Sequence, residues 1–333
     1  MQHELKVFRV DREGDRNPSV EETEEITGIG AELISVDSGS ENETIAKAKA
    51  SDAIITTGAR ISRRVLESLP NLQVVVRYGV GFDTIDVEAA TDNHVLVVNI
   101  PDYCYEEVSN HAIALFLACS RKLAILNNLT SQGKWAHAGS SLAPMGPIFG
   151  QTLGVIGCGN IGRAVAKKAT CFGVEVLGYD PYLEEKVATS AGIRLVSLTD
   201  LLKRSDYVSL HTPLTDETRH MIGEQQLRLM KPTAYLINTS RGPVVDEEML
   251  IKALREKWIA GAGIDVLEKE PPAPSNPLLA MENVIVTPHA AYYSDDSVVR
   301  MRRSVGREAA RVLSGKWPKN LVNKGVIPKK PLM

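Results

Sequence analysis

A glycine-spaced turn near the middle of the sequence has residue types that bind phosphate. The run Gly157-Cys158-Gly159-Asn160-Ile161-Gly162 follows the apolar stretch Thr152–Ile156 and precedes a helical pattern. A β-favouring run, then G-x-G-x-x-G, then a helix is typical of a parallel strand leading into a helix whose N-terminus binds a pyrophosphate. The three glycines allow, in order, the tight turn, the approach of backbone to phosphate, and the packing of helix on strand. The predicted phosphate-binding residues are Gly157, Gly159, Asn160, Ile161 and Gly162.

A carboxylate at the end of the next strand makes this pattern more specific. Asp180 directly follows the predicted strand Val174–Tyr179 and stands 18 residues after Gly162. This is close to the spacing of about 20 residues expected for an acid that hydrogen-bonds the adenosine ribose. Because Pro181 rather than an arginine follows, a 2′-phosphate would meet repulsion, so the sequence predicts NAD and not NADP. The alternative is a glycine-rich turn that packs without binding a ligand.

Three other predicted strand ends carry polar residues that folding alone does not require. They are Asn238–Gly242, Gly263–Val266 and Thr287–Ala290. In doubly wound sheets, ligands bind at the carboxyl ends of the strands. We therefore expect the chemistry of the protein to lie at these three strand ends.

Alternating strands and helices are expected to position these residues. Strands are predicted at Leu5–Val10, Ala31–Val36, Asp52–Ile55, Leu72–Val76 and Val95–Val98, with helical segments between them. A second alternating series runs from Thr152 to Thr287. Such alternation is typical of an α/β fold, in which helices cover both faces of a parallel sheet. The fold class is therefore α/β, with two doubly wound parallel-sheet domains.

Other segments join these two series. Glu106–Leu126 is expected to form one long helix with a buried centre, and the connection 131–151 is expected to use Trp135 as an anchor. Ser297–Leu313 is predicted as a long, charged last helix that crosses back to the first domain.

Length and composition limit the class of protein. With 333 residues, the chain is long enough for about two domains of ~150 residues. A net charge of −3 and a pI near 6.2 provide no general field for nucleic acid or an anionic membrane. No apolar run reaches the ~18 residues of a membrane span, and no signal-peptide pattern is present. The cysteines lack metal-ligand spacing, so we expect a cytoplasmic protein without a metal: Cys104, Cys119, Cys158 and Cys171.

With these motifs in their order, the sequence resembles the D-isomer-specific 2-hydroxyacid dehydrogenases. This family includes the phosphoglycerate, formate and D-lactate dehydrogenases and the C-terminal-binding-protein corepressors. The resemblance covers almost the whole chain and rests on the glycine turn with Asp180, Asn238–Glu247, Gly263–Val266, Glu270-Pro271 and Thr287–Ala290. Three stretches look closest to the corepressor branch and its bacterial relatives: Arg77–Asp83, Asp180–Leu183 and His289–Asp295.

The resemblance implies a discontinuous first domain. Residues 1–102 with 298–333 would form a flavodoxin-like substrate domain, and residues 103–297 an inserted Rossmann NAD-binding domain. The active site would lie in the cleft between them. Family members usually pair through the dinucleotide domain, so a homodimer is expected, using Glu106–Leu126 and Trp135.

The resemblance also implies catalytic roles. Arg241 would bind the substrate carboxylate and carbonyl oxygen with its planar fork of donors. His289 would be the acid/base, and Glu270 would hydrogen-bond its other ring nitrogen and favour the protonated ring. Plainer alternatives are a packing histidine, an arginine paired with Asp246, and a glutamate that only begins a loop.

Further residues are expected around the cofactor and the substrate. The cofactor set beyond the glycine turn is Asp180, His211, Thr212, Pro213, Thr239, Ser240 and Asp265. The N–H groups of Gly79, Val80 and Gly81 can form a concave nest for the substrate carboxylate. The remaining substrate-binding residues are Arg77, Tyr78 and Tyr292. Arg77 is expected either to bind a second anionic group or to make a structural ion pair, and Asp265 is either near the nicotinamide or a strand-end cap.

These expectations predict an NAD-dependent oxidoreductase that interconverts a D-2-hydroxy acid and its 2-oxo acid. Only Arg60 is basic in the stretch 56–60, where the phosphoglycerate branch carries basic residues. A small unphosphorylated acid is therefore favoured. The alternative is an NAD(H)-sensing interaction protein like the corepressors, with weak dehydrogenase activity.

Overall fold

A computed structural model describes residues 4–11 and 18–333 of the chain. The chain divides into two compact units, which we describe separately. Unit 1 consists of Met1–Tyr103 and Ser294–Met333, and unit 2 of Cys104–Tyr293. The first unit is therefore formed by two segments that are distant in the sequence.

In its described residues, unit 1 has five parallel strands, in the order β2-β1-β3-β4-β5. This is the strand order of flavodoxin-like sheets. The elements are β1 Lys6–Asp11, α1 Val20–Thr27, β2 Glu32–Asp37, α2 Glu41–Lys47, β3 Ala53–Thr56, α3 Arg63–Glu67, β4 Val74–Arg77, α4 Val87–Asp92, β5 Leu96–Val98 and α13 Asp295–Leu313.

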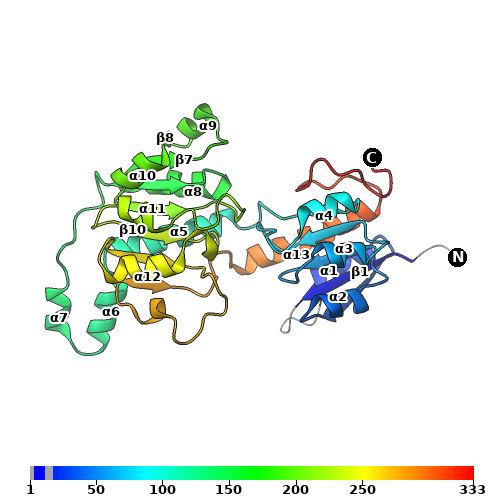
Figure 1. The fold of residues 1–333 in the computed structure, drawn as a ribbon, viewed down its shortest axis with the longest axis horizontal. Coiled ribbons are helices and arrows are strands. Elements are labelled where there is room, and N and C mark those ends of the chain that lie inside the picture. Colours follow the sequence, from blue (N-terminus) through cyan, green and yellow to red (C-terminus); the bar gives the residue numbers. More distant parts are fainter. Residues whose placement is uncertain (1–3, 12–17) are drawn as a thin grey trace. The chain divides into compact units, whose positions relative to one another are not determined.

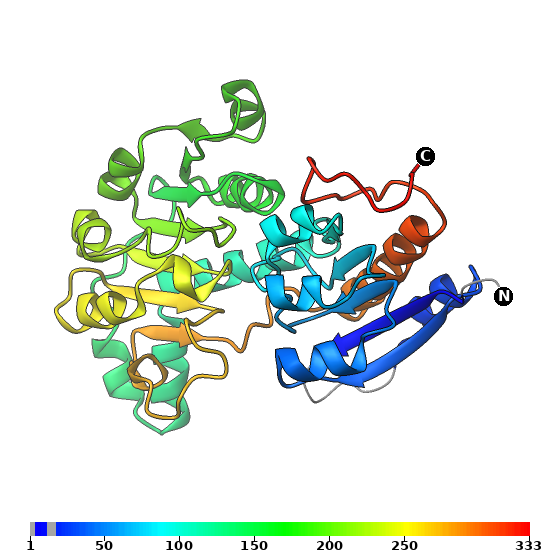
Figure 2. The same ribbon diagram turned by 45° about the vertical axis from the view of Figure 1, so that its right-hand side comes forward.

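The strands of unit 1 are buried because helices cover the sheet. Val74, Val75 and Val76 of β4 are all fully buried, as expected for a parallel strand with both faces covered. Helix α13 packs against α1, β3 and β4 (Figure 2). The close approach of α13 to α1 requires a glycine, because a Cβ atom at Gly306 would lie 2.9 Å from Cα of Glu22. The last helix thus belongs to the core of unit 1.

Unit 2 has seven parallel strands in the order β12-β11-β10-β9-β6-β7-β8. This is the Rossmann order with one added strand, and its switch point lies between β6 and β9. The elements are α5 Tyr105–Ser120, α6 Leu123–Ser131, α7 Trp135–Ser140, β6 Thr152–Ile156, α8 Asn160–Ala169, β7 Glu175–Tyr179, α9 Glu185–Ser190, β8 Arg194–Leu195, α10 Leu198–Arg204, β9 Tyr207–Leu210, α11 Glu224–Leu229, β10 Tyr235–Asn238, α12 Glu247–Arg255, β11 Gly261–Ile264 and β12 Val284–Val286. The predicted α/β class with two parallel sheets is confirmed.

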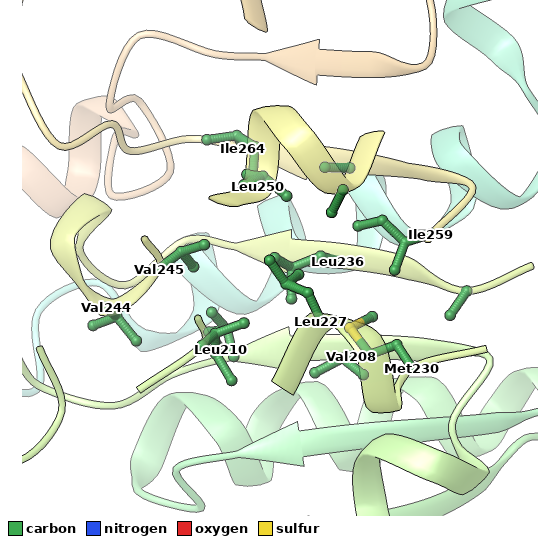
Figure 3. Packing of buried hydrophobic residues seen from close by; sticks show 14 of the residues in the cluster. Val208, Leu210, Leu227, Met230, Leu236, Val244, Val245, Leu250, Ile259 and Ile264 are labelled. Atoms are coloured by element: carbon green, nitrogen blue, oxygen red, sulfur yellow. The ribbon is translucent and has the colours of Figure 1, made fainter. Parts of the chain in front are cut away.

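The core of unit 2 consists of two apolar layers, one on each face of the sheet. One layer joins β9 and β10 to α10, α11 and α12, and Figure 3 shows Val208 and Leu236 of the strands beside Leu227 and Leu250 of the helices. The other layer includes Phe116 of α5 and residues of α8 and α9. Both faces of the central strands β6, β9, β10 and β11 are therefore buried, which leaves their ends for a ligand.

The predicted single helix Glu106–Leu126 is wrong. The structure has two helices, α5 and α6, which meet at 64°. Lys122 lies between them in the left-handed region, with φ of 52°. Its Nζ atom donates to the carbonyl oxygens of Ser141 and Ala143, both at 3.0 Å. The break therefore depends on contacts about 20 residues away, which a local periodicity does not contain.

Two other differences lie in unit 2. Trp135 was expected to be an anchor, but it begins α7 and is 78% exposed. Helix α9 and the two-residue strand β8 were not predicted; both are too short to give a clear periodicity. In the described residues no single helix is long and apolar enough to cross a membrane, and only the bent pair α5 and α6 passes that test together.

Candidate active site

The glycine turn between β6 and α8 has the geometry of a phosphate-binding loop. Gly157 has a φ of 85°, and a Cβ atom there would lie 2.7 Å from the carbonyl carbon of His211. A Cβ atom at Gly162 would lie 2.1 Å from the carbonyl oxygen of Gly157. At Gly159, by contrast, a Cβ atom would meet no atom within 4 Å. Two glycines are thus required by packing, whereas the space beside Gly159 is open at the N-terminus of α8.

Asp180 lies at the end of β7 and is held by backbone groups on both oxygens. The N–H of Cys158 donates to Oδ2, and the N–H of Tyr182 donates to Oδ1, both at 2.9 Å. The carboxylate is therefore fixed next to the glycine turn. Each oxygen has a second lone pair for a ribose hydroxyl. Cys158 itself faces the core, and burial raises the pKa of its thiol to about 12.

Three buried polar atoms follow β9 and β10 without a hydrogen-bond partner in the described part of the chain. They are Nδ1 of His211, Oγ1 of Thr212 and Oγ1 of Thr239. Buried polar atoms are normally hydrogen-bonded, so each calls for a partner that the chain does not supply. Together with the open space at Gly159, these atoms fit a bound dinucleotide at the switch point of the sheet.

His211 has one bonded and one unbonded ring nitrogen. Its Nε2 atom lies 2.9 Å from Oγ of Ser209. Burial lowers the pKa of the ring from 6.5 to about 3, although the side chain as a whole is only partly buried. The ring is therefore neutral at physiological pH, which suits a contact with an uncharged part of a ligand.

The loop after β10 positions Arg241 by hydrogen bonds of its own. Oδ1 of Asn238 accepts from the N–H and the hydroxyl of Ser240, and Nδ2 of Asn238 donates to the carbonyl oxygen of Arg241. A Cβ atom at Gly242 would lie only 2.0 Å from the carbonyl carbon and oxygen of Leu267, so this loop packs directly on the segment before Glu270. The side chain of Ser240 is thus occupied within the loop.

His289 and Glu270 are in direct contact. Nδ1 of His289 lies 2.7 Å from Oε2 of Glu270, and Oε1 of Glu270 accepts from the N–H of Leu267 at 3.0 Å. Burial alone would raise the pKa of Glu270. The hydrogen bond and charge of His289, the N–H of Leu267 and the nearby Arg241 outweigh burial and lower that pKa. Glu270 is therefore an anion that orients the histidine, and Nε2 is the ring nitrogen left for another partner.

Asp265 is almost fully buried at the end of β11 and holds the loop that carries His289. Oδ1 accepts from Oγ1 of Thr287 at 2.5 Å and from the N–H of Ala290 at 2.9 Å, and Oδ2 accepts from the N–H of Ala291 at 3.0 Å. The N–H of His289 donates to the carbonyl oxygen of Asp265. These contacts agree with the strand-end cap that the sequence left open as one role of Asp265.

In unit 1, the predicted substrate residues 77–81 lie at the end of β4 and in the loop that follows it. Gly79 has a φ of 106°, and among the described residues none of the N–H groups of Gly79, Val80 and Gly81 donates a hydrogen bond. The nest is thus a set of free donors. Tyr78, however, is buried, and its hydroxyl donates to Oε2 of Glu22 on α1. Arg77 donates to the carbonyl oxygen of Tyr78.

Sequence reasoning missed two residues that support these loops. Glu22 contacts Tyr78, and Nε2 of His111 on α5 lies 2.9 Å from Oγ1 of Thr287. Both residues are on helices far from their partners in sequence, so no local motif indicates them. The predicted Tyr292 lies next to His289, with 6.4 Å between the two ring centroids. In the described residues no group of three or more His, Cys, Asp or Glu side chains can hold a metal ion.

The Rossmann strand order and the glycine turn are typical of a dinucleotide-binding domain. The family model of the D-isomer specific 2-hydroxyacid dehydrogenase NAD-binding domain matches residues 113–291, just over half of the chain. A glyoxylate reductase of Korarchaeum cryptofilum is 45% identical over 272 residues, covering 81% of this chain and 82% of the relative. The chain belongs to the D-isomer-specific 2-hydroxyacid dehydrogenase family.

Other relatives differ in substrate and cofactor. A D-3-phosphoglycerate dehydrogenase of Methanocaldococcus jannaschii is 40% identical over 87% of this chain and 55% of its own length. The structure of D-lactate dehydrogenase from Aquifex aeolicus with NAD and lactic acid matches 95% of this chain and 99% of its own, with 31% identity and a TM-score of 0.82. An acyclic imino acid reductase structure with NADPH and D-Arg matches 96% of this chain and 100% of its own, with 30% identity and a TM-score of 0.84. The branch of corepressors remains a prediction from sequence.

The low pKa of His211 makes stability depend on pH. Between pH 6.5 and about 3 the unfolded chain binds a proton that the folded chain does not, so the free energy of unfolding falls as pH falls. For one proton the free energy of unfolding changes by at most about 1.4 kcal/mol per pH unit. We expect a smaller slope because the side chain of His211 is partly exposed. In His211→Gln this part of the slope should be lost when urea unfolding is measured from pH 4.5 to 6.5. His137→Gln, at an exposed histidine, is the control and should keep the wild-type slope. If the free energy of unfolding depends on pH in the same way in the wild type and in His211→Gln, the low pKa of His211 is not the cause.

Proposed function

We propose that this protein is an NAD-dependent enzyme that interconverts a D-2-hydroxy acid and its 2-oxo acid. The observation that carries the proposal is the contact of 2.7 Å between Nδ1 of His289 and Oε2 of Glu270. It lies within a chain whose family transfers hydride between such acids and a nicotinamide. Reduction of the 2-oxo acid is the direction described below, and the reverse steps give oxidation.

The proton is supplied by His289. Glu270 holds Nδ1 and so orients the ring, and Nε2 donates its proton to the carbonyl oxygen as the carbonyl carbon accepts the hydride. Arg241 is proposed to bind the carboxylate and polarise the carbonyl oxygen through its planar donors. After reduction, His289 is neutral and must regain a proton from solvent. The exposed edge of His289, 43% of the side chain, allows this exchange.

The nicotinamide cofactor, when bound, would supply the hydride as NADH in the reducing direction and accept it as NAD+ in the reverse direction. The residues proposed to hold it are the glycine turn, Asp180, and the unpartnered atoms of His211, Thr212 and Thr239, with Pro213, Ser240 and Asp265 beside them. Asp180 supports NAD over NADP because a carboxylate fixed by two N–H groups repels a 2′-phosphate.

The substrate is proposed to be a small unphosphorylated 2-oxo acid, bound in part by the N–H groups of Gly79, Val80 and Gly81. Relatives named as glyoxylate reductases support this class. Arg60, the basic residue of the stretch 56–60, has a side chain that is 78% exposed, and its Nε atom lies 3.6 Å from Oε1 of Glu41. A panel of glyoxylate, pyruvate and one phosphorylated 2-oxo acid with NADH tests the class; fastest turnover of the phosphorylated acid would contradict it.

Removal of the proton donor should abolish catalysis and leave cofactor binding intact. In His289→Ala we expect turnover of the best acid in the panel to fall by at least ~10²-fold, the usual cost of losing a general acid. NADH affinity, measured by fluorescence titration, should be unchanged. In Glu270→Gln the turnover should fall less, because the amide oxygen can still accept the hydrogen bond from Nδ1 that orients the ring. Unchanged turnover in His289→Ala would remove this residue from the mechanism.

Neutralising Asp180 should reduce the discrimination between the two cofactors. Asp180→Asn keeps the size of the side chain but removes the charge that repels a 2′-phosphate. We expect the ratio of NADPH to NADH dissociation constants to fall about tenfold, equivalent to about 1.4 kcal/mol. Asp200→Asn, at an exposed aspartate of the same unit, is the charge-matched control. A ratio equal to that of the control would show that Asp180 does not select the cofactor.

A second copy of the chain is proposed to cover α6 and α7. None of the nine residues of α6 is buried, although Leu123, Ile125, Leu126 and Leu129 are apolar. Trp135 is 78% and Leu142 48% exposed. Figure 1 shows α6 and α7 standing away from the sheet of unit 2. Apolar surface of this kind usually marks an interface.

If α6 and α7 form the dimer interface, a charged side chain introduced there should change the oligomeric state. Trp135→Glu and Leu123→Glu should convert the dimer to a monomer in sedimentation velocity, because a charge in an apolar interface loses its hydration. Ile327→Glu, at an exposed apolar residue of unit 1 (72%), is the control and should leave the dimer intact. A dimer in all three variants would place the interface elsewhere.

A further inference from the structure

A fully buried carboxylate, that of Glu22, contacts Tyr78, the residue before the loop 79–81 that is proposed to bind the substrate acid. Glu22 on α1 has no exposed surface. Its Oε1 lies 3.0 Å from Nη1 of Arg9 and accepts from the N–H of Ser19 at 2.9 Å, and its Oε2 accepts from the hydroxyl of Tyr78. A buried charge is tolerated only when it is paired and hydrogen-bonded in this way. Glu22 thus connects β1, the start of α1 and the end of β4.

Arg9 completes this buried cluster. Its Nε lies 3.1 Å from Oδ2 of Asp11, and its Cζ lies 5.6 Å from the centre of the Tyr78 ring. Oδ1 of Asp11 accepts from the N–H of Thr57 at 2.7 Å. Burial, and then the charge of Glu22, raise the pKa of Tyr78 well above its usual value, so its hydroxyl remains a donor.

The loop after Tyr78 has three consecutive carbonyl oxygens that are fixed. The carbonyl of Tyr78 accepts from Nη1 of Arg77, that of Gly79 from the N–H of Ile100, and that of Val80 from Nδ2 of Asn99. In a planar trans peptide the N–H points opposite to the carbonyl oxygen. Fixing these carbonyls therefore fixes the directions of the N–H groups of residues 79, 80 and 81, which have no acceptor in the described chain.

We propose that Glu22 is a positioning residue for binding of the substrate acid, acting through Tyr78 on the N–H groups of residues 79–81. The hydroxyl of Tyr78 then serves as an internal anchor and not as a ligand of the substrate. This inference rests on the proposed function, because it assigns the nest to the substrate carboxylate. It adds Glu22, Arg9 and Asn99 to the residues on which that site depends.

Tyr78→Phe tests the anchor with the least change of packing. We expect the dissociation constant of oxamate, an unreactive analogue of a 2-oxo acid, to rise about three- to tenfold in NADH-loaded protein, measured by calorimetry. The KM for glyoxylate should rise by a similar factor, and the affinity for NADH should not change. Asn99→Ala removes the donor to Val80 and should raise both constants independently.

Tyr207→Phe is the matched control. Tyr207 is also buried, and its hydroxyl also donates to a side chain, Oε1 of Gln151 at 2.8 Å. It lies at the first residue of β9, the end of the strand opposite to the candidate site. Both tyrosine variants should unfold at a lower urea concentration than the wild type. Only Tyr78→Phe should bind oxamate more weakly. Equal dissociation constants of oxamate in the two variants would overturn the inference, and so would a wild-type protein that does not bind oxamate.

The oxamate measurement does not depend on turnover. A wild-type protein that binds oxamate but reduces no acid would contradict the proposed catalytic role of His289, while the comparison of Tyr78→Phe with Tyr207→Phe would still decide the role of the anchor. Conversely, turnover could be lost in His289→Ala while Tyr78→Phe and Tyr207→Phe bind oxamate with equal dissociation constants. That result would retain the proposed function and reject the positioning role of Glu22.

Discussion

The candidate active site depends on one buried carboxylate, Asp265. Its oxygens and its backbone carbonyl accept hydrogen bonds from four groups in the loop 287–291, including the N–H of His289. His289 has a φ of 52°, a conformation that is unfavourable for residues other than glycine and persists only when its surroundings impose it. Asp265 supplies that constraint, and the contact between His289 and Glu270 follows from it.

The sheet of unit 2 brings these loops together because its strands are parallel. The glycine turn follows β6, Asp180 follows β7, the unpartnered atoms follow β9 and β10, and Asp265 follows β11. Carboxyl ends of parallel strands share one edge of the sheet. Strand order therefore converts motifs spread over more than 100 residues into one site, and the two apolar layers of the core keep the strand ends in register.

The sequence predicts most of what is local in this protein. The parallel α/β class and the family are confirmed, because strand runs, the glycine turn and strand-end motifs are short-range signals. The break at Lys122 was missed because its ammonium binds carbonyls about 20 residues away. Glu22 and His111 were missed because each contacts a partner far along the chain. The roles of the individual site residues remain predictions.

Tyr78 has contacts that its position beside the glycines of the nest does not indicate. The sequence places it among the predicted substrate-binding residues, and that role remains a prediction. Arg77 is the last residue of β4, and Tyr78 is the first residue of the bend that follows it. Once Tyr78 is directed into the core beside α1, its hydroxyl requires a buried acceptor, and Glu22 provides one. If the N–H groups of residues 79–81 bind the substrate carboxylate as proposed, they would recognise any carboxylate, and selection among acids would then come from side chains elsewhere.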